Sequence, residues 1–233
     1  MSICLDLPFG FSALWRAEPK NGLNHMGQHR RSKFRAKNYN HPKKGASIKV
    51  EPIRQIEEIA RIKANLADQP RDLCLFTLGI NTAYRAGELL SISVGQVDYL
   101  RPGDRLDIKQ SKSGKYRSVT MNRTVMATIR NWLSVHPNPV RDAPLFWSRK
   151  SRSALSVSAV NALVKKWCRE AGVLGQNFGS HTLRKTWGYH QRVHNNQPIP
   201  LLMVAYGHST QAQTLDYLCI QDDEIADLYG MEL

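Results

Sequence analysis

Along residues 49–233 the apolar positions recur mostly three and four residues apart. This spacing places them on one face of a helix and therefore predicts a series of amphipathic helices. The first follows Pro52 and carries apolar side chains at Ile53, Ile56, Ile59, Ile62 and Leu66. Further helices are expected over 70–80, 85–90, 125–133 and 157–167, and shorter ones around 181–195, 199–206, 210–219 and 222–230.

The period changes to two between residues 105 and 121. Leu106 and Ile108 alternate with polar residues, and Val119 and Met121 do so again after a segment that contains Gly114. Alternation predicts strands with one buried face, and a glycine between two such runs is typical of a hairpin turn. The expected fold class is therefore α+β, mostly α-helical with a small antiparallel β-sheet.

Residues 1–48 lack this periodicity and are rich in Ser, Gly, Pro and Asn. Residues 1–50 contain ten Lys and Arg but only two Asp and Glu, and so hold more than half of the formal net charge of +14. The basic positions that we single out are Arg30, Arg31, Lys33, Arg35, Lys37, Lys43 and Lys44. We expect a flexible basic arm over 1–48 that contacts DNA; a solvated charge run without a specific role is the alternative.

The charge of +14 and the isoelectric point of about 9.9 indicate an anionic partner, which is usually nucleic acid. A membrane surface fits less well, because no basic helix has a large apolar face and no apolar run reaches the length of a membrane span. Cys4, Cys74, Cys168 and Cys219 form no CxxC pair, which argues against a zinc site and a disulfide scaffold. We expect a cytoplasmic protein without a metal.

An ordered set of polar residues suits phosphate chemistry. In chain order these are Arg85 and Glu88 within 83–89, Lys112 in a Ser-Lys-Ser-Gly segment, His181 and Arg184 spaced as His-x-x-Arg, His208 between Gly and Ser, and Tyr217 nine residues further on. Guanidinium groups stay charged and donate paired hydrogen bonds to phosphate oxygens, and a phenol can act as a nucleophile. Taken singly, each residue has a simpler interpretation; Arg85, for example, could be a surface ion-pair partner of Glu88.

The order and spacing of these residues resemble the catalytic motifs of tyrosine recombinases, the phage integrase family. The resemblance covers about residues 50–233 and implies the tyrosine recombinase catalytic-domain fold of DNA breaking-rejoining enzymes. It implies that Tyr217 attacks DNA to form a covalent 3′-phosphotyrosine, and that strand exchange proceeds through a Holliday junction. No metal, nucleotide or other cofactor is needed, because the covalent link stores the energy of the broken bond.

The resemblance also implies a role for each residue. Arg85 and Arg184 would clamp the phosphate, and Glu88 would orient these arginines. Lys112 would protonate the leaving 5′-oxygen, although Lys115 on the same hairpin is an alternative and Lys109 a weaker one. His181 would accept a proton and position the nucleophile, and His208 would donate a hydrogen bond to the phosphate.

The expected partner is double-stranded DNA with specific sites. The expected function is that of a site-specific recombinase of a mobile genetic element, which would act at the nucleoid. The resemblance implies a homotetramer on paired sites, with an accessory protein as a further possibility, because residues 1–48 do not amount to the helical clamp domain of most family members. The tail 218–233 would dock on a neighbouring protomer or fold back on its own domain. Alternatives are relaxation of DNA in the manner of a type IB topoisomerase and an inactive DNA-binding relative.

Overall fold

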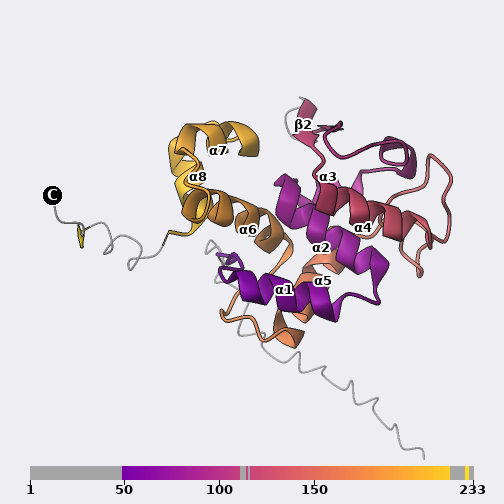
Figure 1. Cartoon of the computed structure of the whole chain (residues 1–233), viewed down its shortest axis with the longest axis horizontal. Coiled ribbons are helices and arrows are strands. Elements are labelled where there is room, and N and C mark those ends of the chain that lie inside the picture. Colours follow the sequence, from indigo (N-terminus) through magenta and orange to yellow (C-terminus); the bar gives the residue numbers. More distant parts are fainter. Residues whose placement is uncertain (1–48, 111–113, 115, 221–228, 231–233) are drawn as a thin grey trace, which may run out of the picture. The chain divides into compact units, whose positions relative to one another are not determined.

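The computed structural model describes residues 49–110, 114, 116–220 and 229–230 (Figure 1). Its helices are α1 (Ile56–Asn65), α2 (Pro70–Thr82), α3 (Ala86–Leu90), α4 (Arg123–Leu133), α5 (Val157–Glu170), α6 (Ser180–Val193), α7 (Ile199–Tyr206) and α8 (Gln211–Leu218), with a 3-10 turn at Val94–Gln96. The strands are β1 (Arg105–Lys109) and β2 (Tyr116–Thr120), which form one antiparallel sheet. The expected mostly helical α+β class is confirmed.

Helix α2 lies at the centre of the main core. It begins with Pro70, whose fixed φ and missing N–H suit the first turn of a helix. Its side chains Leu75, Phe76 and Leu78 are fully buried, and the helix packs against α4 and α6 (Figure 1). It ends where Ala83 adopts a left-handed conformation with φ of 54°, which turns the chain directly into α3.

Helix α1 departs from the expected apolar stripe. It begins at Ile56, which is 55% exposed, so the prediction that this residue packs inward is wrong. Glu58 is buried instead, because its carboxylate accepts a hydrogen bond of 2.8 Å from the backbone of Leu174. Ile53 is buried but precedes the helix, in an extended segment whose N–H donates to Thr186 Oγ1 at 2.9 Å.

The hairpin of β1 and β2 has the expected antiparallel pairing. Leu106 pairs with Val119 and Ile108 with Arg117, on the face that turns inward. Gly114 has φ of +67° and its N–H donates to the carbonyl of Gln110 at 2.9 Å, as the turn requires. Residues 111–113 and 115 lie outside the described residues.

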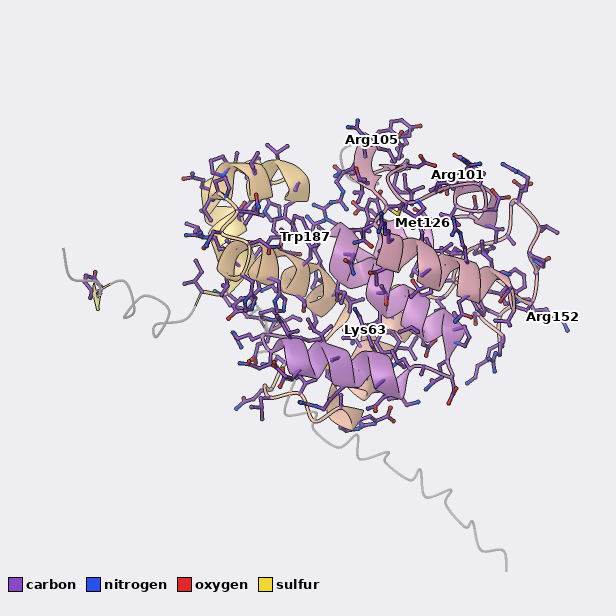
Figure 2. The ribbon with its side chains drawn as sticks, in the orientation of Figure 1. Lys63, Arg101, Arg105, Met126, Arg152 and Trp187 are labelled. Carbon is purple, nitrogen blue, oxygen red and sulfur yellow. The ribbon has the colours of Figure 1, made fainter. Side chains whose placement is uncertain are left out.

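Helices α6, α7 and α8 enclose a second, smaller apolar cluster. It is formed by Ala83, Leu202, Tyr206 and Leu218, with Tyr217 and Trp187 packed against it. Trp132 and Trp167 are buried, whereas Trp187 (labelled in Figure 2) is only partly buried. Its ring meets the Tyr206 ring edge-on, with centroids 5.3 Å apart. The expected helix over 222–230 falls almost wholly outside the described residues.

Candidate active site

The junction between α2 and α3 positions Arg85 and Glu88. Arg85 is the N-cap of α3, and the carboxylate of Glu88 accepts hydrogen bonds from the Arg85 backbone at 2.7 Å and from Arg85 Nη1 at 2.9 Å. A carboxylate three residues into a helix commonly caps its first turn in this way. The side chain of Glu88 is only 4% exposed and that of Arg85 is 28% exposed. The ion pair between Arg85 and Glu88, which the sequence suggested as an alternative, is therefore present. Its carboxylate is buried and its guanidinium reaches the surface.

Arg184 on α6 lies beneath this junction and is 1% exposed. Its Nη1 donates to the carbonyl of Ala83 and its Nη2 donates to the carbonyl of Tyr206 at 2.6 Å. These carbonyls end α2 and α7, where backbone acceptors lack helical partners and carry partial negative charge. Burial, and to a lesser extent the charges of Arg85 and Arg117, lower the pKa of Arg184 to about 10. The guanidinium nevertheless stays protonated at neutral pH.

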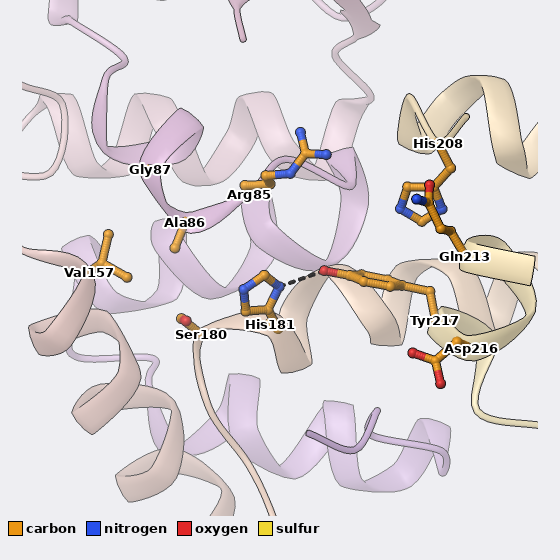
Figure 3. Close-up of a pocket in the computed structure, with 10 residues that line it drawn as sticks. All are labelled: Arg85, Ala86, Gly87, Val157, Ser180, His181, His208, Gln213, Asp216 and Tyr217. Atoms are coloured by element: carbon orange, nitrogen blue, oxygen red, sulfur yellow. Dashed lines mark hydrogen bonds between the residues drawn. The ribbon is translucent and has the colours of Figure 1, made fainter. Parts of the chain in front are cut away.

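Tyr217 and His181 lie on different helices and contact each other. Tyr217 lies in the last turn of α8 and His181 in the first turn of α6, and Tyr217 Oη is 2.6 Å from His181 Nδ1 (Figure 3). The Arg184 guanidinium lies 5.5 Å from the centroid of the Tyr217 ring. Burial has the largest effect and leaves the pKa of Tyr217 above its ordinary value of 10, although the charges of Arg184 and Arg85 act to lower it. The pair thus places a phenol oxygen, a proton acceptor and cations together.

His208 follows Gly207, which ends α7 in a left-handed conformation with φ of +65°. Its ring stacks on Tyr206 with centroids 4.8 Å apart, and its Nδ1 is 3.1 Å from Thr214 Oγ1. Burial, together with the charges of Arg184, Arg85 and Arg117, lowers the pKa of His208 to about 4. The imidazole is therefore neutral at neutral pH. When the Thr214 hydroxyl donates to Nδ1, the ring proton lies on Nε2, which can donate to a ligand.

An open cleft of about 430 Å³ collects most of the expected side chains (Figure 3). Its lining residues are Arg85, Ala86, Gly87, Val157, Ser180, His181, His208, Gln213, Asp216 and Tyr217. Arg184 lies buried behind Tyr217, and Glu88 lies behind Arg85. The structure thus assembles residues that are up to 132 positions apart in the chain, from Arg85 to Tyr217.

Several expected site residues fall outside the described part of the chain. These are Lys112, Lys115 and the basic positions Arg30, Arg31, Lys33, Arg35, Lys37, Lys43 and Lys44. The weaker alternative Lys109 is described and is exposed at the end of β1. The choice among the three hairpin lysines therefore stays a prediction.

Two buried cations were not among the residues expected at the site. Arg117 on β2 is 8% exposed, and its Nη2 lies 2.8 Å from Glu88 Oε2. Lys185 on α6 is 5% exposed, and its Nζ lies 5.3 Å from the Tyr217 ring centroid. A signal for Arg117 was present in the sequence, because it precedes Val119 by two positions and therefore shares the inward face of its strand.

No group of three or more His, Cys, Asp or Glu side chains among the described residues is arranged to hold a metal ion. None of the helices described has the length and apolar character needed to cross a bilayer.

Comparison with known proteins places this chain in a family. The phage integrase family matches residues 52–224. The probable integrase/recombinase YoeC of Bacillus subtilis is 30% identical over 183 residues, which are 77% of this chain and 95% of that protein. Tyrosine recombinase XerC of Caldanaerobacter subterraneus is 27% identical over 204 residues, covering 85% of this chain but 56% of XerC.

Solved structures agree on the fold. The crystal structure of XerA recombinase superposes with a TM-score of 0.64 at 21% identity, covering 81% of this chain and 65% of that one. The pre-cleavage complex of XerH recombinase bound to its difH substrate gives a TM-score of 0.58 at 21% identity, over 80% of this chain and 56% of XerH. The family match extends over most of the described residues and includes the cleft that holds Arg85, His181, His208 and Tyr217. This chain belongs to the phage integrase family and carries the catalytic domain of a tyrosine recombinase.

Proposed function

We propose that this chain is a site-specific DNA recombinase that cuts and rejoins DNA through a covalent link to Tyr217. The observation that carries the proposal is the 2.6 Å contact between Tyr217 Oη and His181 Nδ1, at a cleft that Arg85 lines and beside the buried charge of Arg184. A phenol ordinarily ionises near pH 10, so it needs a proton acceptor and nearby positive charge to attack at neutral pH. Both are present here.

In the proposed reaction the Tyr217 oxygen attacks the phosphorus of a phosphodiester while its proton passes to His181. A bond forms between the phenol oxygen and phosphorus, and the bond from phosphorus to the 5′-oxygen breaks. The 5′-oxygen leaves as a hydroxyl with a proton from Lys112, or from Lys115 if that residue is the acid. Attack by a different 5′-hydroxyl reverses these steps and joins new strands.

The cations stabilise the extra negative charge of the transition state. Arg85 lines the cleft and would donate to the phosphate directly. Arg184 is bound to the Ala83 and Tyr206 carbonyls through Nη1 and Nη2, and each of these nitrogens carries a second N–H that would donate to the phosphate. The neutral His208 donates a hydrogen bond to a phosphate oxygen. Donors fixed in place before the reaction contribute on the order of 3 kcal/mol each.

The proposed substrate is double-stranded DNA with paired sites, bound at the nucleoid by a homotetramer. The net charge of +14 supports a nucleic acid partner. The XerH structure contains its DNA substrate, and a lambda integrase structure shows a dimer on a core site. The basic residues of 1–48 would contact DNA outside the cleft, and an accessory protein would assist where these contacts are insufficient.

The test uses a nicked suicide substrate carrying the ends of the element that encodes the chain. We expect the unsubstituted protein to form an adduct with DNA that survives denaturation, and Tyr217→Phe to form none, because it lacks only the phenol oxygen. A conservative control is Tyr99→Phe, which changes an exposed tyrosine outside the cleft and keeps the adduct.

Other outcomes separate the competing functions. DNA binding without an adduct would contradict cleavage and indicate an inactive DNA-binding relative. Relaxation of supercoiled DNA that lacks partner sites would indicate a topoisomerase. An adduct that persists in Tyr217→Phe would show that another residue is the nucleophile.

A further inference from the structure

Arg117 is a buried cation at the inward face of the β-hairpin. It pairs across the sheet with Ile108, and its guanidinium lies 4.6 Å from the centroid of the Tyr84 ring. Its Nε and Nη1 are buried and have no hydrogen-bond partner among the described residues. Burying a guanidinium is costly unless the charge is compensated. The compensating group is Glu88, whose Oε2 lies 2.8 Å from Arg117 Nη2.

Glu88 is shared between two arginines. Its Oε1 binds Arg85 Nη1 at 2.9 Å, while its Oε2 binds Arg117 Nη2 at 2.8 Å and the Arg85 backbone at 2.7 Å. Arg184 is close enough for the charges of Arg85 and Arg117 to lower its pKa. Two guanidinium groups thus bind one buried carboxylate. Arg184 adds a third positive charge nearby, so this group of residues carries net positive charge beside the cleft.

We propose that Arg117 is a positioning residue that neutralises Glu88 and thereby leaves the charge of Arg85 available to the phosphate of the DNA. This role rests on the proposed function. The side chain of Arg85 is more exposed than that of Arg117. Without Arg117, the buried carboxylate of Glu88 would pair with Arg85 alone and hold the Arg85 guanidinium away from the substrate. Arg117 itself acts through Glu88, because its free N–H groups are covered by protein.

The first test replaces Arg117 and measures cleavage of the suicide substrate in a single turnover at saturating DNA. We expect Arg117→Gln to lower the cleavage rate about ten- to a hundredfold, as large as the effect of removing a residue that orients a metal ligand in a metalloenzyme. The dissociation constant for uncleaved DNA, measured in the Tyr217→Phe background, should change little. A matched control is Arg105→Gln, an exposed arginine on the partner strand β1, which should leave the cleavage rate at saturation unchanged (Figure 2).

A second variant separates charge from folding. Arg117→Lys keeps the positive charge and one donor, and we expect it to recover much of the rate lost in Arg117→Gln. Thermal unfolding of both variants shows whether the fold is intact. If Arg117→Lys unfolds at the temperature of the unsubstituted protein and yet cleaves as slowly as Arg117→Gln, neutralisation of Glu88 is not the role of Arg117.

A double-mutant cycle tests the route through Glu88. Residues that act through one another show coupled effects, whereas independent residues show effects that multiply in rate. We expect Arg117→Gln to cause little further loss in a Glu88→Gln background. Multiplicative losses, or normal cleavage by Arg117→Gln, would contradict the role of Arg117 while leaving the proposed function intact. Absence of an adduct with the unsubstituted protein would contradict both.

Discussion

Arg184 shows how one residue can serve both the fold and the site. Its guanidinium binds carbonyls that end α2 and α7, and the same group lies 5.5 Å from the Tyr217 ring centroid. The spacing of His181 and Arg184 suggested a phosphate clamp, but not that the clamp would be 1% exposed. Its position depends on two helix ends that are distant in sequence, and so only the folded chain reveals it.

The depressed pKa of His208 makes a prediction about stability. The ring has a pKa of about 4 in the folded protein against an ordinary value of 6.5, so below about pH 6.5 the unfolded chain binds a proton that the folded protein does not. The stability that the neutral ring contributes is therefore lost as the pH falls from about 6.5 towards 4. We expect the Tm of the unsubstituted protein to fall more steeply over this window than the Tm of His208→Gln.

Thermal unfolding followed by circular dichroism at a series of pH values checks this expectation. Burial also lowers the pKa of His190, so part of the acid sensitivity should remain in His208→Gln and decrease further when His190→Gln is added. Parallel pH profiles for His208→Gln and the unsubstituted protein would show that the ring titrates alike in the folded and unfolded states.

At the scale of elements, the contact between α6 and α7 depends on Gly188. A Cβ at this position would lie 1.7 Å from the Tyr206 hydroxyl, which donates to the Arg184 carbonyl at 3.1 Å. We expect Gly188→Ala to destabilise the protein by about 2 kcal/mol, because overpacking forces α6 and Tyr206 apart. It should also slow cleavage, since the Tyr206 carbonyl helps to hold Arg184. Urea unfolding measures the first effect.

Two further variants make this prediction specific. Gly87→Ala on α3 places a methyl group where no atom lies within 4 Å, and it should leave the free energy of unfolding almost unchanged. Combining Gly188→Ala with Tyr206→Leu removes the clashing ring and should restore part of the lost stability. A loss of similar size in Gly87→Ala would show that the helices are sensitive to any added methyl group.

The elements themselves were largely predictable, and the exceptions have local causes. Pro70, the left-handed Gly114 and the alternation in β1 are short-range signals, and the structure confirms the helix and the hairpin that they predicted. The exposure of Ile56 was not predicted, because the polar Glu58 is buried in its place and accepts a hydrogen bond from the backbone of Leu174. Residues about a hundred positions away decide which face of α1 is buried, and no local pattern contains that information.

At the scale of the whole molecule, the uneven distribution of charge makes a prediction about DNA binding. Residues 1–50 hold ten Lys and Arg against two Asp and Glu. Each phosphate contact by Lys or Arg releases counterions, so affinity falls as salt rises. We expect neutral substitution of Arg30, Arg31, Lys33, Arg35 and Lys37 to flatten the plot of log affinity against log salt while cleavage at saturating DNA is retained.

Fluorescence anisotropy over a salt series measures that slope. A matched control replaces five exposed basic residues of the described part, Arg101, Arg105, Arg149, Lys150 and Arg152, which shifts the net charge equally. An unchanged slope for the first set would indicate that its charges are solvated and do not contact DNA.

The sequence alone determined the kinds of residue, their order and their local structures, because helical and strand periods and the recombinase motifs are properties of short segments. It thereby determined the family and the expected nucleophile. Only the tertiary structure decided that Tyr217 reaches His181, that Arg184 is buried between two helix ends, and that Arg117 shares Glu88 with Arg85. These arrangements depend on packing and desolvation between segments that are far apart in the chain, and a charged side chain looks the same in sequence whether its partner is water or a buried carboxylate.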